Sequence, residues 1–92
     1  MDTKIKMISA ASRVLTYSKN NPMAIDEEVF QDVTDYISQE KIRDEKTKQA
    51  MIASASRAYE LFRKNPKMHE KEILRLIMEE TPSILSQIEE EY

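Results

Sequence analysis

The chain has 92 residues, of which 14 are Lys or Arg, 17 are Asp or Glu and one is His, and it contains no Gly, Cys or Trp. This length suffices for one small domain with a single thin core, so we treat residues 1–92 as one domain. Without glycine, the phosphate-cradling loops of nucleotide-binding proteins and the usual tight β-hairpin turns are excluded. Without cysteine, disulfide scaffolds, thiolate metal sites and thiol catalysis are excluded, and we expect a cytoplasmic protein.

An internal similarity appears when the chain is compared with itself at an offset of 44 positions. The segment MISAASR at 7–13 falls on MIASASR at 51–57, and Asn21-Pro22 falls on Asn65-Pro66. Eight of the thirty residue pairs that begin with Met7 and Met51 are identical, where average composition predicts about two. This pattern indicates a duplicated helical hairpin, although two amphipathic hairpins can also resemble each other through composition alone.

The first hairpin is predicted over about residues 3–41. Asp2 or Thr3 can cap its first helix, and the Asn21-Pro22 pair ends that helix because a residue before proline is disfavoured in the α conformation. The acidic run at residues 26–28 suits the start of the second helix, where the helix dipole favours negative charge.

The second hairpin is predicted over about residues 45–80, with Asp44 as the cap of its first helix and Asn65-Pro66 as its turn. Thr81-Pro82 is expected to interrupt the following helix, with Thr as the N-cap and Pro as the first residue of a short C-terminal helix over about residues 82–91.

The apolar periodicity predicts an all-α four-helix bundle made of two similar hairpins plus the short C-terminal helix. Small residues such as Ala11 and Ala55 place the first and third helices together at its centre. The predicted core comprises the residues of the helical stripes, namely Ile8, Ala11, Leu15, Val29, Phe30, Val33, Ile37, Ile52, Ala55, Tyr59, Phe62, Ile73, Leu74 and Ile77.

Catalytic and metal-binding motifs are absent from the sequence. A di-iron or di-manganese bundle needs two Glu-x-x-His pairs, and His69 is the sole histidine. No serine lies in a recognisable nucleophile motif. We therefore expect no enzyme activity, no cofactor, no metal and no small-molecule substrate, and no segment approaches the roughly 20 apolar residues of a membrane span.

Charge is distributed unevenly, with net charges of −3 over residues 1–40, +5 over 41–75 and −5 over 76–92. One interpretation is a solvated basic face that balances the acidic first hairpin and tail. The alternative is a nucleic-acid contact through the basic residues of the third helix and second turn, namely Lys46, Arg57, Arg63, Lys64 and Lys67.

Two arginines and two glutamates recur at the 44-residue offset, namely Arg13 with Arg57 and Glu28 with Glu72. All four are predicted to point away from the core stripes. We therefore expect no ion pair between the two residue types within a hairpin, and a surface contact would contribute under about 1 kcal/mol.

The last part of the chain carries more apolar residues than one packed stripe can bury. Either the C-terminal helix folds back over its own core, or this region forms an interface with another protein or with a second copy. The preferred function is accordingly a small protein-interaction module. Its candidate interface residues are Leu76, Met78, Ile84, Leu85, Ile88 and Tyr92.

Overall fold

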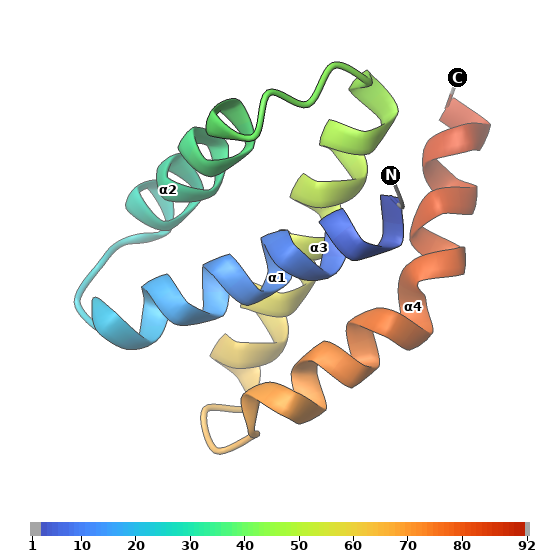
Figure 1. The fold of residues 1–92 in the computed structure, drawn as a ribbon. Helices are drawn as coiled ribbons and strands as arrows, with labels where there is room; N and C mark the ends of the chain where they lie inside the picture. The colour runs from blue at the N-terminus through green and yellow to red at the C-terminus, as the bar shows by residue number, and fades with distance from the viewer. Residues whose placement is uncertain (1–2, 92) are drawn as a thin grey trace.

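The computed structural model describes residues 3–91, which contain four α-helices and no strand. The helices are α1 (Thr3–Asn20), α2 (Asp26–Gln39), α3 (Glu45–Lys64) and α4 (Glu70–Glu91) (Figure 1). The all-α prediction is confirmed, with one helix fewer than expected.

The two Asn-Pro turns end α1 and α3 through the same hydrogen bonds. The backbone N–H groups of Asn21 and Asn65 donate to the carbonyls of Tyr17 and Leu61, each at 2.9 Å. The side-chain amides of both asparagines donate to these same carbonyls, at 3.0 and 3.3 Å. The predicted helix ends are therefore confirmed, because each asparagine satisfies a carbonyl that the finished helix leaves open.

Side chains also mark the helix starts. The Asp44 carboxylate accepts a hydrogen bond from the backbone N–H two residues later at 3.2 Å, as predicted for the cap of α3. At the start of α2, the Glu28 carboxylate accepts from the backbone N–H of Ile25 at 3.3 Å. For α1, Thr3 is already the first helical residue and not a preceding cap, and Asp2 lies outside the described residues.

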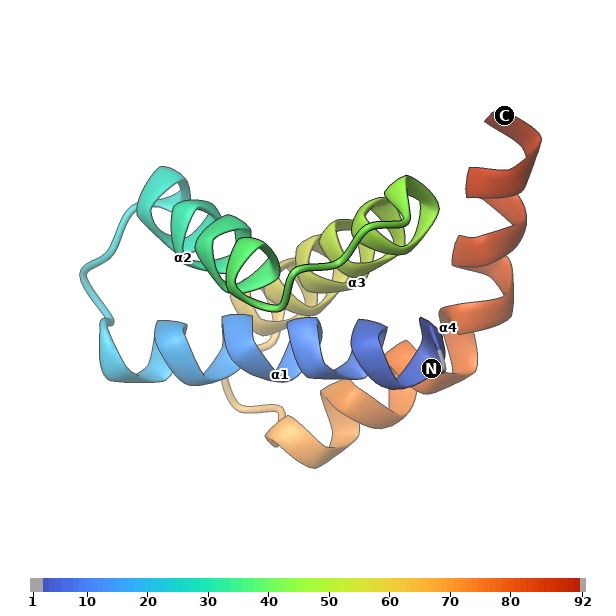
Figure 2. The same ribbon diagram turned by 45° about the horizontal axis from the view of Figure 1, so that its top comes forward.

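The central pair of the fold is α1 and α3, which cross each other, with α2 and α4 packed on opposite sides (Figures 1 and 2). Within residues 3–91, no Cα atom of α2 lies within 8 Å of a Cα atom of α4. Small side chains allow α1 and α3 to approach closely, as predicted. The fully buried small residues of this pair are Ala10, Ala11, Ala50, Ser54, Ala55 and Ala58.

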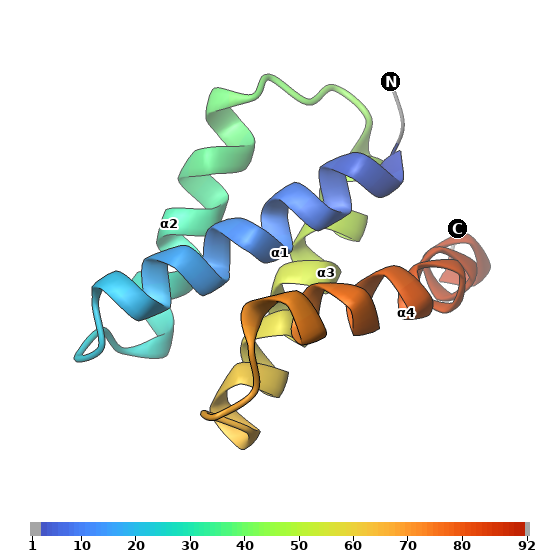
Figure 3. The ribbon, with the colours of Figure 1, turned by 60° about the horizontal axis from the view of Figure 1, so that its bottom comes forward.

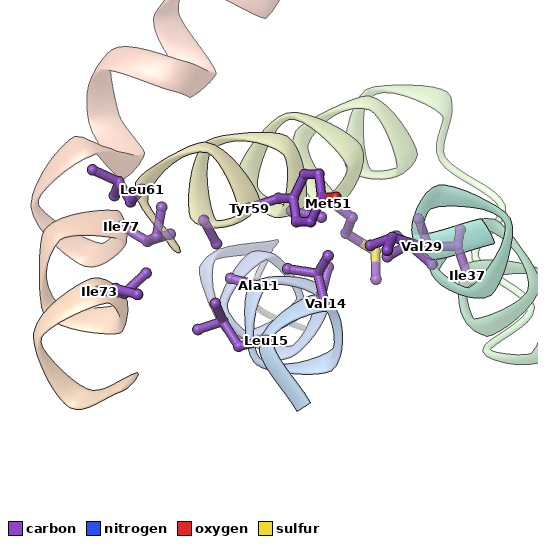
Figure 4. Packing of buried hydrophobic residues seen from close by; sticks show 14 of the residues in the cluster. Ala11, Val14, Leu15, Val29, Ile37, Met51, Tyr59, Leu61, Ile73 and Ile77 are labelled. Carbon is purple, nitrogen blue, oxygen red and sulfur yellow. The ribbon is translucent and has the colours of Figure 1, made fainter. Parts of the chain in front are cut away.

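The main core lies on both sides of this crossing. Figure 4 shows Ala11 and Leu15 on the side of α1 that faces Ile73 and Ile77 of α4. On the other side, Met51 of α3 lies toward α2. One continuous cluster therefore joins all four helices.

Of the predicted core residues of α3, Ala55 and Tyr59 are buried, but the prediction for Ile52 is wrong, because Ile52 is 42% exposed whereas Met51 beside it is 1% exposed. The tight crossing is centred on the stripe of small residues that contains Ser54 and Ala55. A neighbouring position lies about 100° away around the helix, so Ile52 points outward. Four other predicted core residues are half-buried at the edge of the main cluster, namely Ile8, Phe30, Phe62 and Leu74.

The predicted break at Thr81-Pro82 is wrong, because α4 continues through Pro82. The helix instead bends about midway along its length (Figures 1 and 3). Proline cannot donate the helical hydrogen bond to the carbonyl four residues earlier, and this loss is a common cause of a helix bend. Thr81 is not an N-cap either: it is 2% exposed, and its hydroxyl donates to the Ile77 carbonyl at 2.8 Å.

The bend brings the second half of α4 against the first turns of α1 and α3. There Ile88 is 7% exposed and forms a small second cluster with Met7 and Ala50, against which Ile84 and Leu85 also pack. Part of the surplus apolar surface of the C-terminal region is thus covered by the chain itself.

The loop between α2 and α3 contains a residue in a conformation that favours glycine. Lys41 has a φ angle of 54°, in the left-handed region. It directly follows the C-cap residue Glu40, and its backbone N–H donates to the Ser38 carbonyl at 3.2 Å. Glycine is the usual residue at this helix-ending position because a Cβ atom is unfavourable there.

Replacing Lys41 with glycine is expected to stabilise the protein by up to about 1 kcal/mol, because the steric cost of the left-handed conformation disappears. Chemical denaturation should show the gain as a higher midpoint with an unchanged slope. Lys41→Ala is the control, since it removes the same side chain but retains Cβ, and it should give no gain. An equal gain from alanine would contradict the explanation.

Truncation of Ile88 tests the packing of the second half of α4. Ile88→Ala should lower the free energy of unfolding by about 2–4 kcal/mol, as expected for a buried isoleucine. The adjacent exposed residue provides the control, and Glu89→Ala should change stability by under about 0.5 kcal/mol. If both variants unfold at the same denaturant concentration as the parent, the packing of Ile88 on Met7 and Ala50 is not present in solution.

Candidate functional site

An open groove of about 960 Å³ lies between α1 and α4, and we call it the α1–α4 groove. Two of its lining residues are large, apolar and exposed: Ile5 on α1 is 62% exposed and Met78 on α4 is 61% exposed. Ile8 and Leu74 also line it, and they are half-buried against the main core. The groove therefore presents apolar side chains from both helices.

The polar lining of the α1–α4 groove consists of cations and hydroxyl groups. Its charged residues within the described part of the chain are Lys4 and Arg13, and no described carboxylate side chain lines it. Tyr36 of α2 also lines it. Hydroxyl groups come from α1 and from α4, namely Ser9, Ser12, Thr16 and Thr81.

Arg13 is held in place by contacts with α2. Its Nε and Nη2 atoms donate to the two carboxylate oxygens of Asp32, each at 2.9 Å. Its guanidinium carbon also lies 5.5 Å from the centre of the Tyr36 ring, as in a cation–π contact. The Asp32 hydrogen bonds raise the pKa of Arg13. The Arg13 side chain remains 45% exposed, so this positioned cation stays open to solvent.

A second groove, of about 720 Å³, lies between α3 and α4, and we call it the α3–α4 groove. Seven of its lining residues lie 44 positions after lining residues of the α1–α4 groove. Its chemistry differs, because Gln49, Glu60 and Glu80 stand where the first groove has Ile5, Thr16 and Tyr36. The three positions with the same residue in both grooves pair Ile8 with Ile52, Ser12 with Ser56 and Arg13 with Arg57.

Arg57 in the α3–α4 groove is surrounded by carboxylates. Its Nε and Nη2 atoms donate to Glu80 at 2.8 and 3.2 Å, and its Nη1 atom donates to Glu60. These hydrogen bonds raise the pKa of Arg57. The hydrogen bond between Arg57 and Glu60 is also the main reason that the pKa of Glu60 is lowered. All three guanidinium nitrogens are thus engaged, in contrast to Arg13.

The two arginines therefore form ion pairs within their hairpins that the sequence interpretation missed. As expected, no ion pair joins them to Glu28 or Glu72. Glu28 and Glu72 are exposed, as expected, whereas each long arginine side chain reaches from the flank of its helix to the next one. The acceptors do not recur at the 44-residue offset, so the internal sequence similarity gave no signal for them.

The candidate interface residues of the sequence interpretation divide into several groups. Met78 lies in the α1–α4 groove, and Ile88 is buried in the second cluster. Tyr92 lies outside the described residues. The remaining residues are half-buried, namely Leu76, Ile84 and Leu85. Sequence reasoning did not identify Ile5, because the groove arises only when α1 and α4 pack side by side.

The basic residues proposed for nucleic-acid contact are largely engaged with acidic groups. Arg57 contacts Glu60 and Glu80 as described, and Lys64 Nζ lies 3.5 Å from Glu60 Oε2. Arg63 donates to Asp26 at 2.7 Å. The other two members of the set, Lys46 and Lys67, are exposed.

A small polar cluster fastens the start of α2 to α3. The Tyr59 hydroxyl donates to the Asp26 carboxylate, and Arg63 Nη1 donates to both residues. The Tyr59 ring also packs edge-on against Phe30, with ring centroids 5.4 Å apart. Burial and the hydrogen bond to Asp26 raise the pKa of Tyr59 above its ordinary value.

Other classes of site have no support in the described part of the chain. Among the side chains that the structure describes, over residues 3–89, no group of His, Asp and Glu is placed to hold a metal ion. None of the four helices combines the length and the apolar composition needed to cross a bilayer. No protein-family model matches the chain, nor does any curated protein or solved structure.

The polar cluster predicts a pH-dependent stability. Because the folded state raises the pKa of Tyr59, the stabilisation by its neutral hydroxyl is present below about pH 10 and is lost as the pH rises through the folded-state value. Tyr59→Phe should destabilise the protein by about 1 kcal/mol at neutral pH. In denaturation series up to about pH 11, the difference from the parent should then shrink. A difference that grows with pH would contradict the assignment, and Tyr17→Phe is the control.

Proposed function

We propose that this chain is a helical protein-interaction module that binds a partner protein through the α1–α4 groove, without catalysis and without a cofactor. The observation that carries the proposal is the exposure of Ile5 and Met78 on the two walls of one groove. Large apolar side chains gathered on one surface commonly mark a binding site, because their burial by a partner is favourable. Met78 was also part of the interface expected from the sequence.

We further propose that the chain consists of two copies of one helical hairpin. Support comes from the sequence identities at the 44-residue offset, from the equal hydrogen bonds of the two Asn-Pro turns and from the shared lining positions of the two grooves. On this proposal the two grooves are related surfaces, and the α3–α4 groove serves as an internal comparison. A cytoplasmic location remains part of the proposal and rests on the absence of cysteine.

Nucleic-acid binding is the less favoured alternative. Affinity for nucleic acid depends on cations that can neutralise phosphates. Arg57, Arg63 and Lys64 already contact carboxylates of this chain, and the chain carries a net charge of −3. These contacts favour the solvated basic face over a phosphate-binding face.

A peptide-display selection tests the proposed function. A random library of helix-forming peptides of about 14 residues, long enough to span the groove, is selected on the parent protein. Selected peptides should bind Met78→Lys at least about tenfold more weakly, the loss expected when a charge replaces a central apolar anchor.

Ile52→Lys is the matched control, because it introduces the same charge at a half-exposed apolar position of the other groove. It should leave the affinity of the selected peptides within about twofold of the parent. If no selected peptide distinguishes Met78→Lys from Ile52→Lys, the groove is not the binding surface and the proposed function is wrong.

A further inference from the structure

We propose that the occupant of the α1–α4 groove is an amphipathic helix of another protein that carries acidic residues beside its apolar stripe. This inference rests on the proposed function and specifies the chemistry of the partner. Three features of the groove support it: its helical walls, the charge of its lining, and the poor fit of a second copy of this chain to it.

The walls of the groove suit a helix. Ile5 and Ile8 on α1 and Leu74 and Met78 on α4 are spaced by three and four residues, so each pair forms a ridge along one face of its helix. Such ridges accept apolar side chains that recur at helical spacing on a partner. The lining of α1 extends from Lys4 to Thr16, which corresponds to about 18 Å or three helical turns.

The charge of the lining selects an acidic partner. Lys4 and Arg13 line the groove, and among the lining residues that the structure describes there is no carboxylate side chain, although the chain as a whole is acidic. Asp32 engages Nε and Nη2 of Arg13, so the Nη1 group can still donate to an incoming carboxylate. Because Asp32 and the Tyr36 ring already fix the guanidinium, little side-chain entropy is lost when a partner binds.

The α3–α4 groove of the same chain does not suit an acidic helix. Its lining includes Glu60 and Glu80, and these carboxylates occupy all three guanidinium nitrogens of Arg57. An acidic helix would be repelled there, since like charges at an interface are unfavourable. The two grooves thus share three residue types at equivalent positions but differ in the sign of the charge they favour.

A second copy of this chain does not fit the groove well. A symmetric contact would place the cationic lining of one groove against that of the other, which is unfavourable. The acidic helix α2 cannot fill the groove either, because its exposed residues are all polar and would leave Ile5 and Met78 without apolar contacts. The second half of α4 is acidic as well, but its apolar residues Ile84, Leu85 and Ile88 already pack in the second cluster of their own chain. The occupant is therefore a helix from a different protein.

The test uses the groove-dependent peptides obtained by display on the full-length chain. Their sequences should combine apolar residues at helical spacing with Asp or Glu at flanking positions. Replacing those acidic residues with Asn and Gln in a synthetic peptide should weaken binding about tenfold, and the loss should be smaller at high salt. This change leaves the protein untouched, so the result does not depend on the folding of a variant.

The protein side of the contact is tested with Arg13→Ala and its matched control Arg57→Ala. Arg13→Ala should weaken binding of the acidic peptide by about threefold to tenfold, as expected for one partly exposed charged contact. It should bind the neutral peptide as the parent does, a selectivity that a mere loss of stability would not produce. Arg57→Ala should bind both peptides as the parent does.

Three results would overturn the inference while leaving the proposed function standing. The first is that the groove-dependent peptides lack acidic residues. The second is that circular dichroism shows no gain of helix in these peptides when they bind. The third is that the chain alone sediments at about 100 μM as a dimer that Met78→Lys dissociates. In the last case the groove accepts a second copy. The absence of any Met78-dependent peptide, by contrast, would overturn the proposed function itself.

Discussion

The close crossing of α1 and α3 is the contact on which the rest of the structure depends. Residues such as Ala10, Ser54 and Ala58 are fully buried there, and larger side chains at these positions would separate the helices. Alanine provides this close approach without the loss of helix propensity that glycine would bring. Ser54 fits by size alone, since its buried hydroxyl has no hydrogen-bond partner. With the central pair fixed, α2 and α4 pack on opposite sides of it.

The same crossing determines which residues reach the surface. Because Met7, Ala11 and the corresponding residues of α3 face inward, side chains one position along the helix turn toward the flanks. Ile8 and Ile52 are such residues, and each lines one of the two grooves. The grooves are therefore a geometric consequence of the packing, and the residues around them determine their chemistry.

The sequence predicts local features well and tertiary surfaces poorly. The Asn21 and Asn65 helix ends and the Asp44 cap were predicted because the chemistry that stops or starts a helix lies within a few residues. The outward position of Ile52 and the continuous helix through Pro82 depend on neighbouring helices. The candidate site was predicted only through Met78. Its other half comes from α1, and no local pattern of α4 shows which helix will pack beside it.

The bend in α4 links the stability of the fold to the groove. Before the bend, Leu74 and Met78 form one wall of the α1–α4 groove, whereas after it Ile88 covers Met7 near the start of α1. A straight helix would carry its second half away from the first turns of α1 and α3, and Met7 would lose that cover. Because Met7 lies on the same turns of α1 as Ile5 and Ile8, the second half of α4 supports the part of α1 that forms the opposite wall. An apolar groove can thus remain open in a small domain, since its walls are held by contacts outside the groove.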